Sequence, residues 1–160
     1  MRFVKSFKYA FRGIIYCINN ERNMRIHTVA ALYVFVFSFF FKMSRTSYAV
    51  LFLTIASVMM AELFNTVSEE LSDMAAASFN PVVRIVKDMA AGGVLICALF
   101  SVAVGVCIFW QPPVFIKIIS FFISNPMMLL LLLFATALSI VFIAMGPIGI
   151  RDFIRKERDK

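Results

Sequence analysis

The sequence predicts an all-α integral membrane protein: a helical bundle with an N-terminal amphipathic surface helix, three core transmembrane helices and an additional fourth C-terminal transmembrane helix. The first reason is composition. The 160 residues are 62% hydrophobic with a mean hydropathy of +0.91, whereas soluble domains are roughly half apolar. Nineteen Phe and ten Met residues suit a surface that faces lipid. The second reason is that apolar residues gather into long stretches separated by short polar or proline-containing breaks.

Residues 2–18 are predicted to form the surface helix. At about 100° per residue, one face carries apolar side chains, namely Phe3, Phe7, Phe11, Ile14 and Ile18. The opposite face carries cations and tyrosines, namely Arg2, Lys5, Lys8, Tyr9, Arg12 and Tyr16. A basic face opposite Phe and Ile is typical of a helix that lies on an anionic membrane surface. The alternative, a packed helix of a soluble domain, does not fit the rest of the sequence.

Four transmembrane helices are predicted, at about 27–42, 47–66, 89–110 and 126–146. The first is short for a span, which usually needs about 20 residues. His27 and Lys42 at its ends can extend their polar groups to the interface and so make up the difference. The second is expected to continue as a helix beyond the membrane, as far as Asp73 or Met74.

The connections are predicted from polar residues and prolines. Residues 75–84 are expected to be a loop that an Asn-Pro pair stops. Residues 114–123 are expected to form a short interfacial helix, and the following Ser-Asn-Pro is typical of a capped helix start. These breaks divide the chain into a core, residues 1–110, and a C-terminal segment, residues 111–160.

Charge predicts the orientation in the membrane. Of the sixteen Lys and Arg residues, all but Lys42, Arg45 and Lys117 lie near the two ends of the chain or in the segment 74–87. Because cytoplasmic segments are enriched in cations, both termini are expected in the cytoplasm.

Polar residues interrupt the apolar pattern at the end of the second predicted span. Spacings of three, four and four residues place Glu62, Asn65, Glu69 and Asp73 within an arc of roughly 80° on one helix face, and Glu70 lies outside it. Like charges four residues apart repel and so destabilise a helix. A divalent cation would reverse that effect, and hard oxygen ligands suit Mg²⁺ bound together with phosphates.

Further polar residues are expected at the same membrane interface. Glu21 lies at the start of the first span, and Lys87 and Asp88 lie at the start of the third. Metal ligands, a lysine and a carboxylate base are the working parts of phosphoryl transfer. The sequence contains no GxxxxGK[ST] and no GxGxxG, which excludes the soluble nucleotide-binding loops. The alternative is a polar network that only holds the helices together.

The chain resembles the prokaryotic diacylglycerol kinase and undecaprenol kinase family of small integral membrane kinases. The resemblance covers about residues 2–110. It rests on four segments: "SFKYAFRGI" (6–14), "NERNMRIH" (20–27), "AELFNTVSEELSD" (61–73) and "KDMAAGGVL" (87–95). The third has the family's E-x-x-N-[ST]-x-x-E-x-x-x-D pattern, and its combination with a following Lys-Asp pair is highly specific.

The resemblance implies an enzyme of the bacterial plasma membrane that uses ATP and Mg²⁺ to phosphorylate a lipid alcohol. It also implies a homotrimer with active sites shared between protomers and no nucleic-acid partner. Glu62 would be the base that takes the proton of the lipid hydroxyl, and Glu21 and Glu69 would hold Mg²⁺ with the ATP phosphates. The nucleotide site would be lined by Asn65, Asp73, Lys87 and Asp88 together with these metal ligands, and contacted from the surface helix by Tyr9 and Arg2.

Three features depart from the family pattern. Many relatives carry Tyr-His-Pro where this chain has Phe79-Asn80-Pro81, and many have an aliphatic residue in place of Ser68. Residues 111–160 lie outside the three-span core. The "NERN…IH" form is more similar to the Gram-positive undecaprenol kinases, so undecaprenol is the expected substrate and diacylglycerol, converted to phosphatidic acid, the alternative.

Two functions of other classes stay open. A non-catalytic membrane subunit could retain the fold, although the acidic residues and the lysine are all present. A small cation carrier could use the acids, although they gather at one interface and do not line a path to the middle of the membrane.

Overall fold

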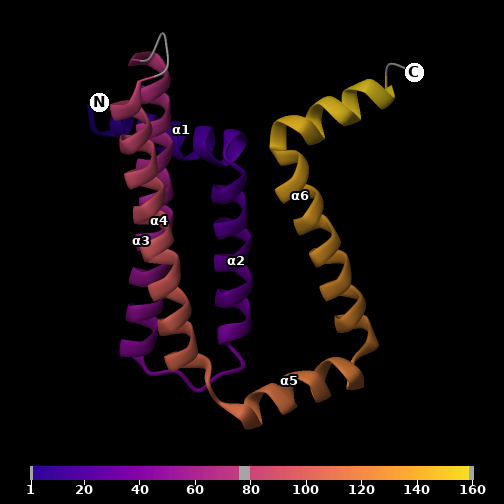
Figure 1. Ribbon diagram of the computed structural model, residues 1–160. Coiled ribbons are helices and arrows are strands. Elements are labelled where there is room, and N and C mark those ends of the chain that lie inside the picture. The colour runs from indigo at the N-terminus through magenta and orange to yellow at the C-terminus, as the bar shows by residue number, and fades with distance from the viewer. Residues whose placement is uncertain (1, 76–79, 159–160) are drawn as a thin grey trace. The chain divides into compact units, whose positions relative to one another are not determined.

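The computed structural model describes residues 2–75 and 80–158, and every element in these ranges is a helix. The helices are α1 (Arg2–Asn20), α2 (Arg22–Ser38), α3 (Arg45–Ala75), α4 (Pro81–Phe109), α5 (Pro112–Ser124) and α6 (Pro126–Arg158), as Figure 1 shows. The predicted all-α membrane fold is confirmed.

Three described helices are long and apolar enough to cross a membrane: Arg45–Ala75, Pro81–Phe109 and Pro126–Lys156. They correspond to the second, third and fourth predicted spans. The helix predicted at 27–42 is present as α2, which has 17 residues and ends at Ser38. Its crossing of the membrane stays a prediction, as does the cytoplasmic position of both termini.

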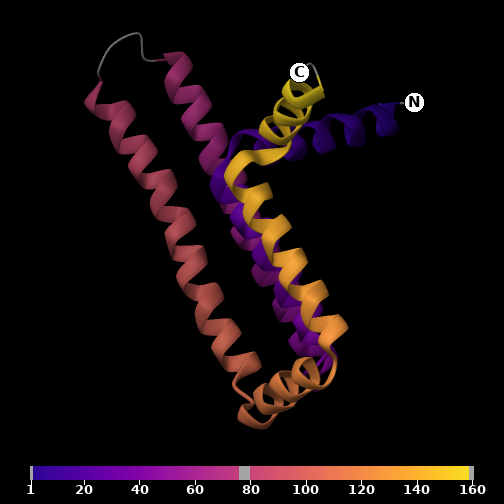
Figure 2. The ribbon, with the colours of Figure 1, turned by 90° about the vertical axis from the view of Figure 1, so that its right-hand side faces the viewer.

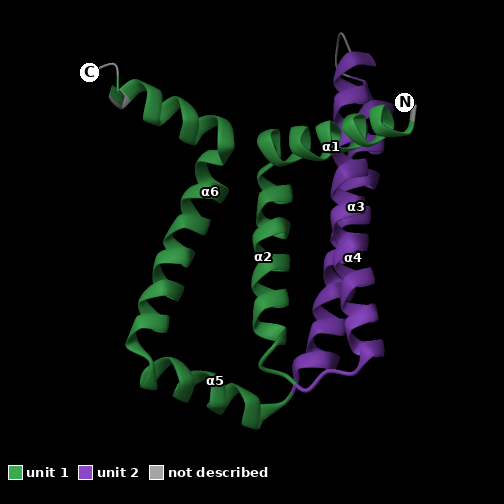
Figure 3. Ribbon diagram, turned by 180° about the vertical axis from the view of Figure 1, so that it is seen from behind, with its two compact units in different colours: residues 1–41, 111–160 green, residues 42–110 purple. Residues whose placement is uncertain are grey.

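The helices form two compact units, which Figure 3 distinguishes by colour. Unit 1 comprises residues 1–41 and 111–160, and unit 2 comprises residues 42–110. The first 41 residues thus group with the C-terminal segment, and the division into a core, residues 1–110, and a C-terminal segment, residues 111–160, stays a prediction.

Unit 2 is a hairpin of two antiparallel helices, α3 and α4, that pack against each other. α3 extends to Ala75, in agreement with the helix predicted to continue past the membrane. The prediction that residues 81–84 belong to a loop is wrong, because α4 begins at Pro81. The Asn80 side chain accepts a hydrogen bond from the backbone N–H of Val82 at 2.9 Å, and proline at the first helical position needs no hydrogen-bond partner.

Unit 1 contains α1, α2, α5 and α6. α1 ends where Glu21 adopts an extended conformation, and the chain then turns into α2, which Figure 1 shows running across the direction of α1. The apolar face of α1 is exposed, with 80% of Phe3 and 61% of Phe11 accessible, as a membrane-surface helix requires. α5 confirms the short helix predicted at 114–123.

α6 bends at Gly146, which has φ 67° and ψ 171°, followed by Pro147. Figures 1 and 2 show the last part of the helix turning away from the direction of its long apolar part. The bend lies at the predicted end of the fourth span, residue 146. A backbone with this φ and ψ is essentially restricted to glycine.

Candidate active site

The polar face predicted at 62–73 lies on α3, and its first part is buried. Only 1% of Glu62 is accessible, and Asn65, Thr66 and Ser72 are each at most 6% accessible. A helix brings residues three, four and seven positions apart onto one side, so these four residues share a face. Glu69 lies on the same face and is half-buried, whereas Asp73, one turn further on, is exposed.

Hydrogen bonds fix the middle of this face. Asn65 Nδ2 donates to Glu69 Oε1 at 2.9 Å, and the Thr66 hydroxyl donates to the Glu62 carbonyl oxygen at 3.0 Å. Asn65 Oδ1 is buried and accepts no hydrogen bond from the described residues. A buried amide oxygen that accepts no hydrogen bond destabilises the folded protein. This atom is therefore suited to bind a cation or a hydrogen-bond donor of a ligand.

α4 contributes a cation at the exposed end of the face. Lys87 Nζ forms an ion pair and a hydrogen bond with Asp73 Oδ1. The Lys87 side chain is one-third exposed, so its ammonium group lies close to solvent beside the last carboxylate of the face. Asp88 lies 4.0 Å from Arg84 on the same helix, and both side chains are largely exposed.

The residues fit a magnesium ion that is shared with a nucleotide. Nowhere in residues 2–75 and 80–158 do three or more His, Cys, Asp or Glu side chains gather closely enough to form a metal cage. Mg²⁺ does not need such a cage, because it commonly binds through one or two carboxylates together with substrate phosphates. Glu69 and the unsatisfied Asn65 Oδ1, on adjacent turns of α3, are oxygen ligands of the required kind.

The remaining predicted site residues belong to unit 1. Glu21 is the N-cap residue of α2. Tyr9 is 61% exposed on α1, with the Arg12 guanidinium 5.8 Å from its ring centroid. The side chain of Arg2 and all of Phe79 lie outside the described residues. Asn80 acts as the helix cap of α4, which is a structural role.

Sequence reasoning missed two polar members of the α3 face and one buried cation. Thr66 and Ser72 are buried beside the predicted residues, and their positions four and ten residues after Glu62 could have indicated this. Arg25 is only 7% accessible. It binds backbone carbonyls of α1 and α6, and no local pattern predicts contacts between such distant segments.

Taken together, unit 2 offers a buried carboxylate, a carboxylate–amide pair one to two turns further on, and a lysine from the neighbouring helix. These groups can accept a proton at a buried carboxylate and bind a metal–phosphate complex toward solvent.

Comparison with known proteins identifies the family. The sequence model described as prokaryotic diacylglycerol kinase matches residues 8–109. A diacylglycerol kinase from Synechocystis is 38% identical over 108 residues, which are 67% of this chain and 62% of that protein. An undecaprenol kinase from Bacillus subtilis is 36% identical over 108 residues, which are 68% of this chain and 88% of that protein.

The matched region contains α2, α3 and α4 and most of α1, and therefore every predicted site residue except Arg2. The whole C-terminal segment, residues 111–160, lies beyond it. The chain belongs to the prokaryotic diacylglycerol kinase family and is thus a membrane lipid kinase, as its motifs predicted.

Proposed function

We propose that this protein transfers the γ-phosphoryl group of ATP to undecaprenol at the membrane interface, forming undecaprenyl phosphate. The observation that carries the proposal is the graded polar face of α3, where Glu62 is buried and the groups suited to metal and phosphate follow toward its exposed end. A buried carboxyl group in such an apolar protein is costly, which favours a chemical role.

The roles proposed for residues of the α3 face and for Lys87 follow from their surroundings, and those proposed for Glu21, Asp88, Tyr9 and Arg2 rest on the resemblance to the family. Glu62 accepts the proton of the lipid hydroxyl as that oxygen attacks the γ-phosphorus, and the bond from this phosphorus to the bridging oxygen breaks to release ADP. Glu69 and Asn65 Oδ1, with Glu21, would hold Mg²⁺, whose charge would offset that of the phosphates. Lys87 binds a phosphate oxygen, while Asp73 positions its ammonium group. Asp88 and Tyr9, with Arg2, contact the nucleotide at the surface.

The choice of undecaprenol over diacylglycerol rests on the similarity of this sequence to undecaprenol kinases. The relatives include one protein named for each substrate, at nearly equal identity. The match covers 88% of the Bacillus undecaprenol kinase but only 62% of the Synechocystis diacylglycerol kinase. The "NERNMRIH" segment is also of the Gram-positive type. Diacylglycerol is the alternative acceptor.

A homotrimer with shared sites is part of the proposal. None of the described α4 residues is buried within the chain, although the helix is strongly apolar. A side-chain carbon added at Gly92 or Gly93 would meet nothing within 4 Å. Small residues on an uncovered apolar helix permit close approach of another transmembrane helix. This surface is therefore available to a second copy of the chain.

Side-by-side assays test the substrate. The purified protein would be supplied with radiolabelled ATP and either undecaprenol or diacylglycerol in matched mixed micelles. We expect a higher kcat/KM for undecaprenol, with residual turnover of diacylglycerol, because apolar contacts alone discriminate by only about 1–3 kcal/mol. An equal or higher kcat/KM for diacylglycerol would contradict the choice of substrate.

A further inference from the structure

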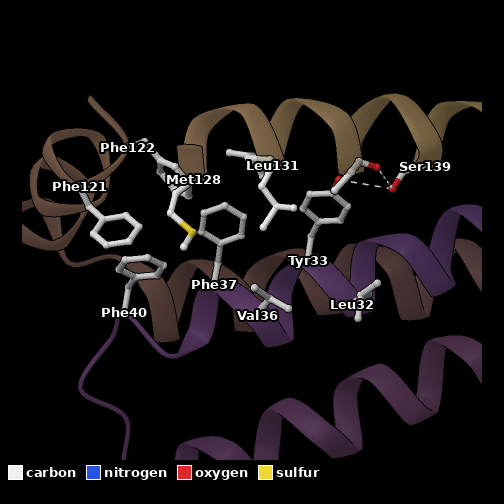
Figure 4. A pocket seen from close by; sticks show the side chains of 12 residues that line it. Leu32, Tyr33, Val36, Phe37, Phe40, Phe121, Phe122, Met128, Leu131 and Ser139 are labelled. Carbon is white, nitrogen blue, oxygen red and sulfur yellow. Dashed lines mark hydrogen bonds between the residues drawn. The ribbon is translucent and has the colours of Figure 1, made fainter. Parts of the chain in front are cut away.

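Unit 1 contains an apolar cavity of about 330 Å³ between α2, α5 and α6. Figure 4 shows its two ends. The rings of Phe37, Phe40, Phe121 and Phe122 gather at one end, and Tyr33 lies at the other beside Ser139. Its size is at the lower limit of cavities that bind small organic ligands.

The few polar groups of this cavity are satisfied by one another. The Tyr33 hydroxyl lies 3.1 Å from Thr136 Oγ1 and 3.4 Å from Ser139 Oγ. Thr136 and Ser139 also donate to backbone carbonyls of their own helix. Hydroxyls bonded in this way join α2 to α6 and do not call for a polar ligand. The lining is therefore suited to a hydrocarbon ligand.

The depth of the cavity restricts which hydrocarbon can reach it from the catalytic interface. Glu21, at the start of α2, marks that interface in the proposed site. A rise of about 1.5 Å per residue places Leu32 about 16 Å and Phe37, in the last turn of the helix, about 24 Å further along the direction of α2. The hydrocarbon core is about 30 Å thick, so its middle is about 15 Å from either interface. With α2 crossing the membrane as predicted, the cavity would lie in the far half of the membrane.

We propose that this cavity binds the distal part of the polyprenyl chain of the lipid substrate whose hydroxyl is phosphorylated at the opposite interface. The inference rests on the proposed function and deepens it. A diacylglycerol held at that interface has acyl tails that end near the middle of the membrane, short of Phe37. A long polyprenyl chain extends beyond the middle, and its methyl-branched, unsaturated units pack well against aromatic rings.

The cavity is a feature that the family match does not contain. Its α5 and α6 lining, including Phe121, Met128 and Ala135, lies after residue 109, where the match ends. The C-terminal segment therefore adds a chain-binding surface to the kinase core. Because lipid tails are themselves apolar, occupancy of this cavity adds selectivity for chain length more than affinity.

Two matched substitutions on α6 test the proposal. Ala135 lines the cavity, whereas Ala137, two residues away, is exposed on the outside of the helix. Ala135→Leu fills the cavity, and Ala137→Leu adds the same atoms outside it. The full chain of each variant would be assayed with undecaprenol and with geraniol, a short prenol whose chain ends well before Leu32.

We expect Ala135→Leu to lower kcat/KM for undecaprenol about three- to ten-fold. This loss is smaller than is usual when an apolar pocket is blocked, because the displaced chain can pack against apolar lipid instead. Turnover of geraniol and all kinetics of Ala137→Leu should be unchanged. Unchanged kinetics of Ala135→Leu with both substrates would overturn the inference. So would an equal loss on both substrates, which would indicate altered packing or an ordinary acyl chain from the other leaflet.

A second measurement does not depend on the variant. A polyprenol with a photoreactive group at the end remote from the hydroxyl should label residues 121–139 or 32–40 of the unaltered protein. Labelling confined to other segments would also overturn the inference. If the unaltered protein phosphorylates no prenol of either length, the proposed substrate fails first and this inference fails with it.

Discussion

Arg25 Nε donates a hydrogen bond to the carbonyl oxygen of Ile143 at a distance of 3.1 Å. In an uninterrupted helix that carbonyl would accept from the residue four positions later, but this residue is Pro147, which has no N–H. Arg25 Nη1 also donates to the carbonyls of Ile18 and Asn19, near the end of α1. One buried side chain thus satisfies the backbone at two helix interruptions, where an unsatisfied carbonyl would be costly.

Gly146→Ala should destabilise the protein, because two features of this position require glycine. Its φ of 67° and ψ of 171° are strained for other residues by about 1–3 kcal/mol. A Cβ there would also lie 2.8 Å from Arg25 Nη1. A clearly lower thermal midpoint in detergent is expected. Gly105→Ala is the control, since its Cβ would meet nothing within 4 Å on α4. Equal midpoints for the two variants would contradict the contact between Arg25 and the bend.

Lys87→Ala should weaken nucleotide binding. We expect the KM for Mg·ATP to rise about ten-fold or more, the usual effect of losing a hydrogen bond to a charged group. Arg84→Ala is the matched control, because Arg84 lies one turn earlier on α4 and contacts the exposed Asp88 at 4.0 Å. The measurement is steady-state kinetics at saturating lipid. A KM of Lys87→Ala equal to that of the unaltered protein would remove Lys87 from the phosphate site.

Glu69→Gln should raise the concentration of Mg²⁺ that gives half-maximal activity. The amide retains an oxygen that can accept the hydrogen bond from Asn65 Nδ2, so packing is kept while the negative charge is lost. Glu70→Gln, on the exposed side of the same helix, should have the unaltered Mg²⁺ dependence. Titration of Mg²⁺ at fixed ATP measures the difference. Identical titrations for the two variants would exclude Glu69 as a metal ligand.

The sequence predicts much of α3 because the information there is local. Spacings of three and four residues determine which side chains share a helix face, and the hydrogen bond between Asn65 and Glu69 agrees with that arrangement. The end of the long apolar part of α6 is likewise predicted by the residues at the bend, Gly146 and Pro147.

The features that sequence reasoning missed depend on other parts of the chain or on a competing local signal. Arg25 is buried because a carbonyl 118 residues away lacks a donor, and nothing within "NERNMRIH" indicates this. The first turn of α4 was expected to be a loop because Asn-Pro usually marks a break. The same pair can also start a helix, with asparagine as the N-cap and proline as the first helical residue. In this protein Asn80 and Pro81 start α4 in that way.

The most direct test of the account is the turnover number of Glu62→Gln, since the proposed chemistry depends on this buried carboxylate as the base. The substitution keeps the size of the side chain and removes its ability to take a proton. With undecaprenol and radiolabelled ATP, we expect kcat to fall about 10²–10⁴-fold, while Mg·ATP binding and the thermal midpoint stay unchanged. A folded variant that phosphorylates lipid at nearly the unaltered rate would contradict the assignment of the α3 face as the catalytic site.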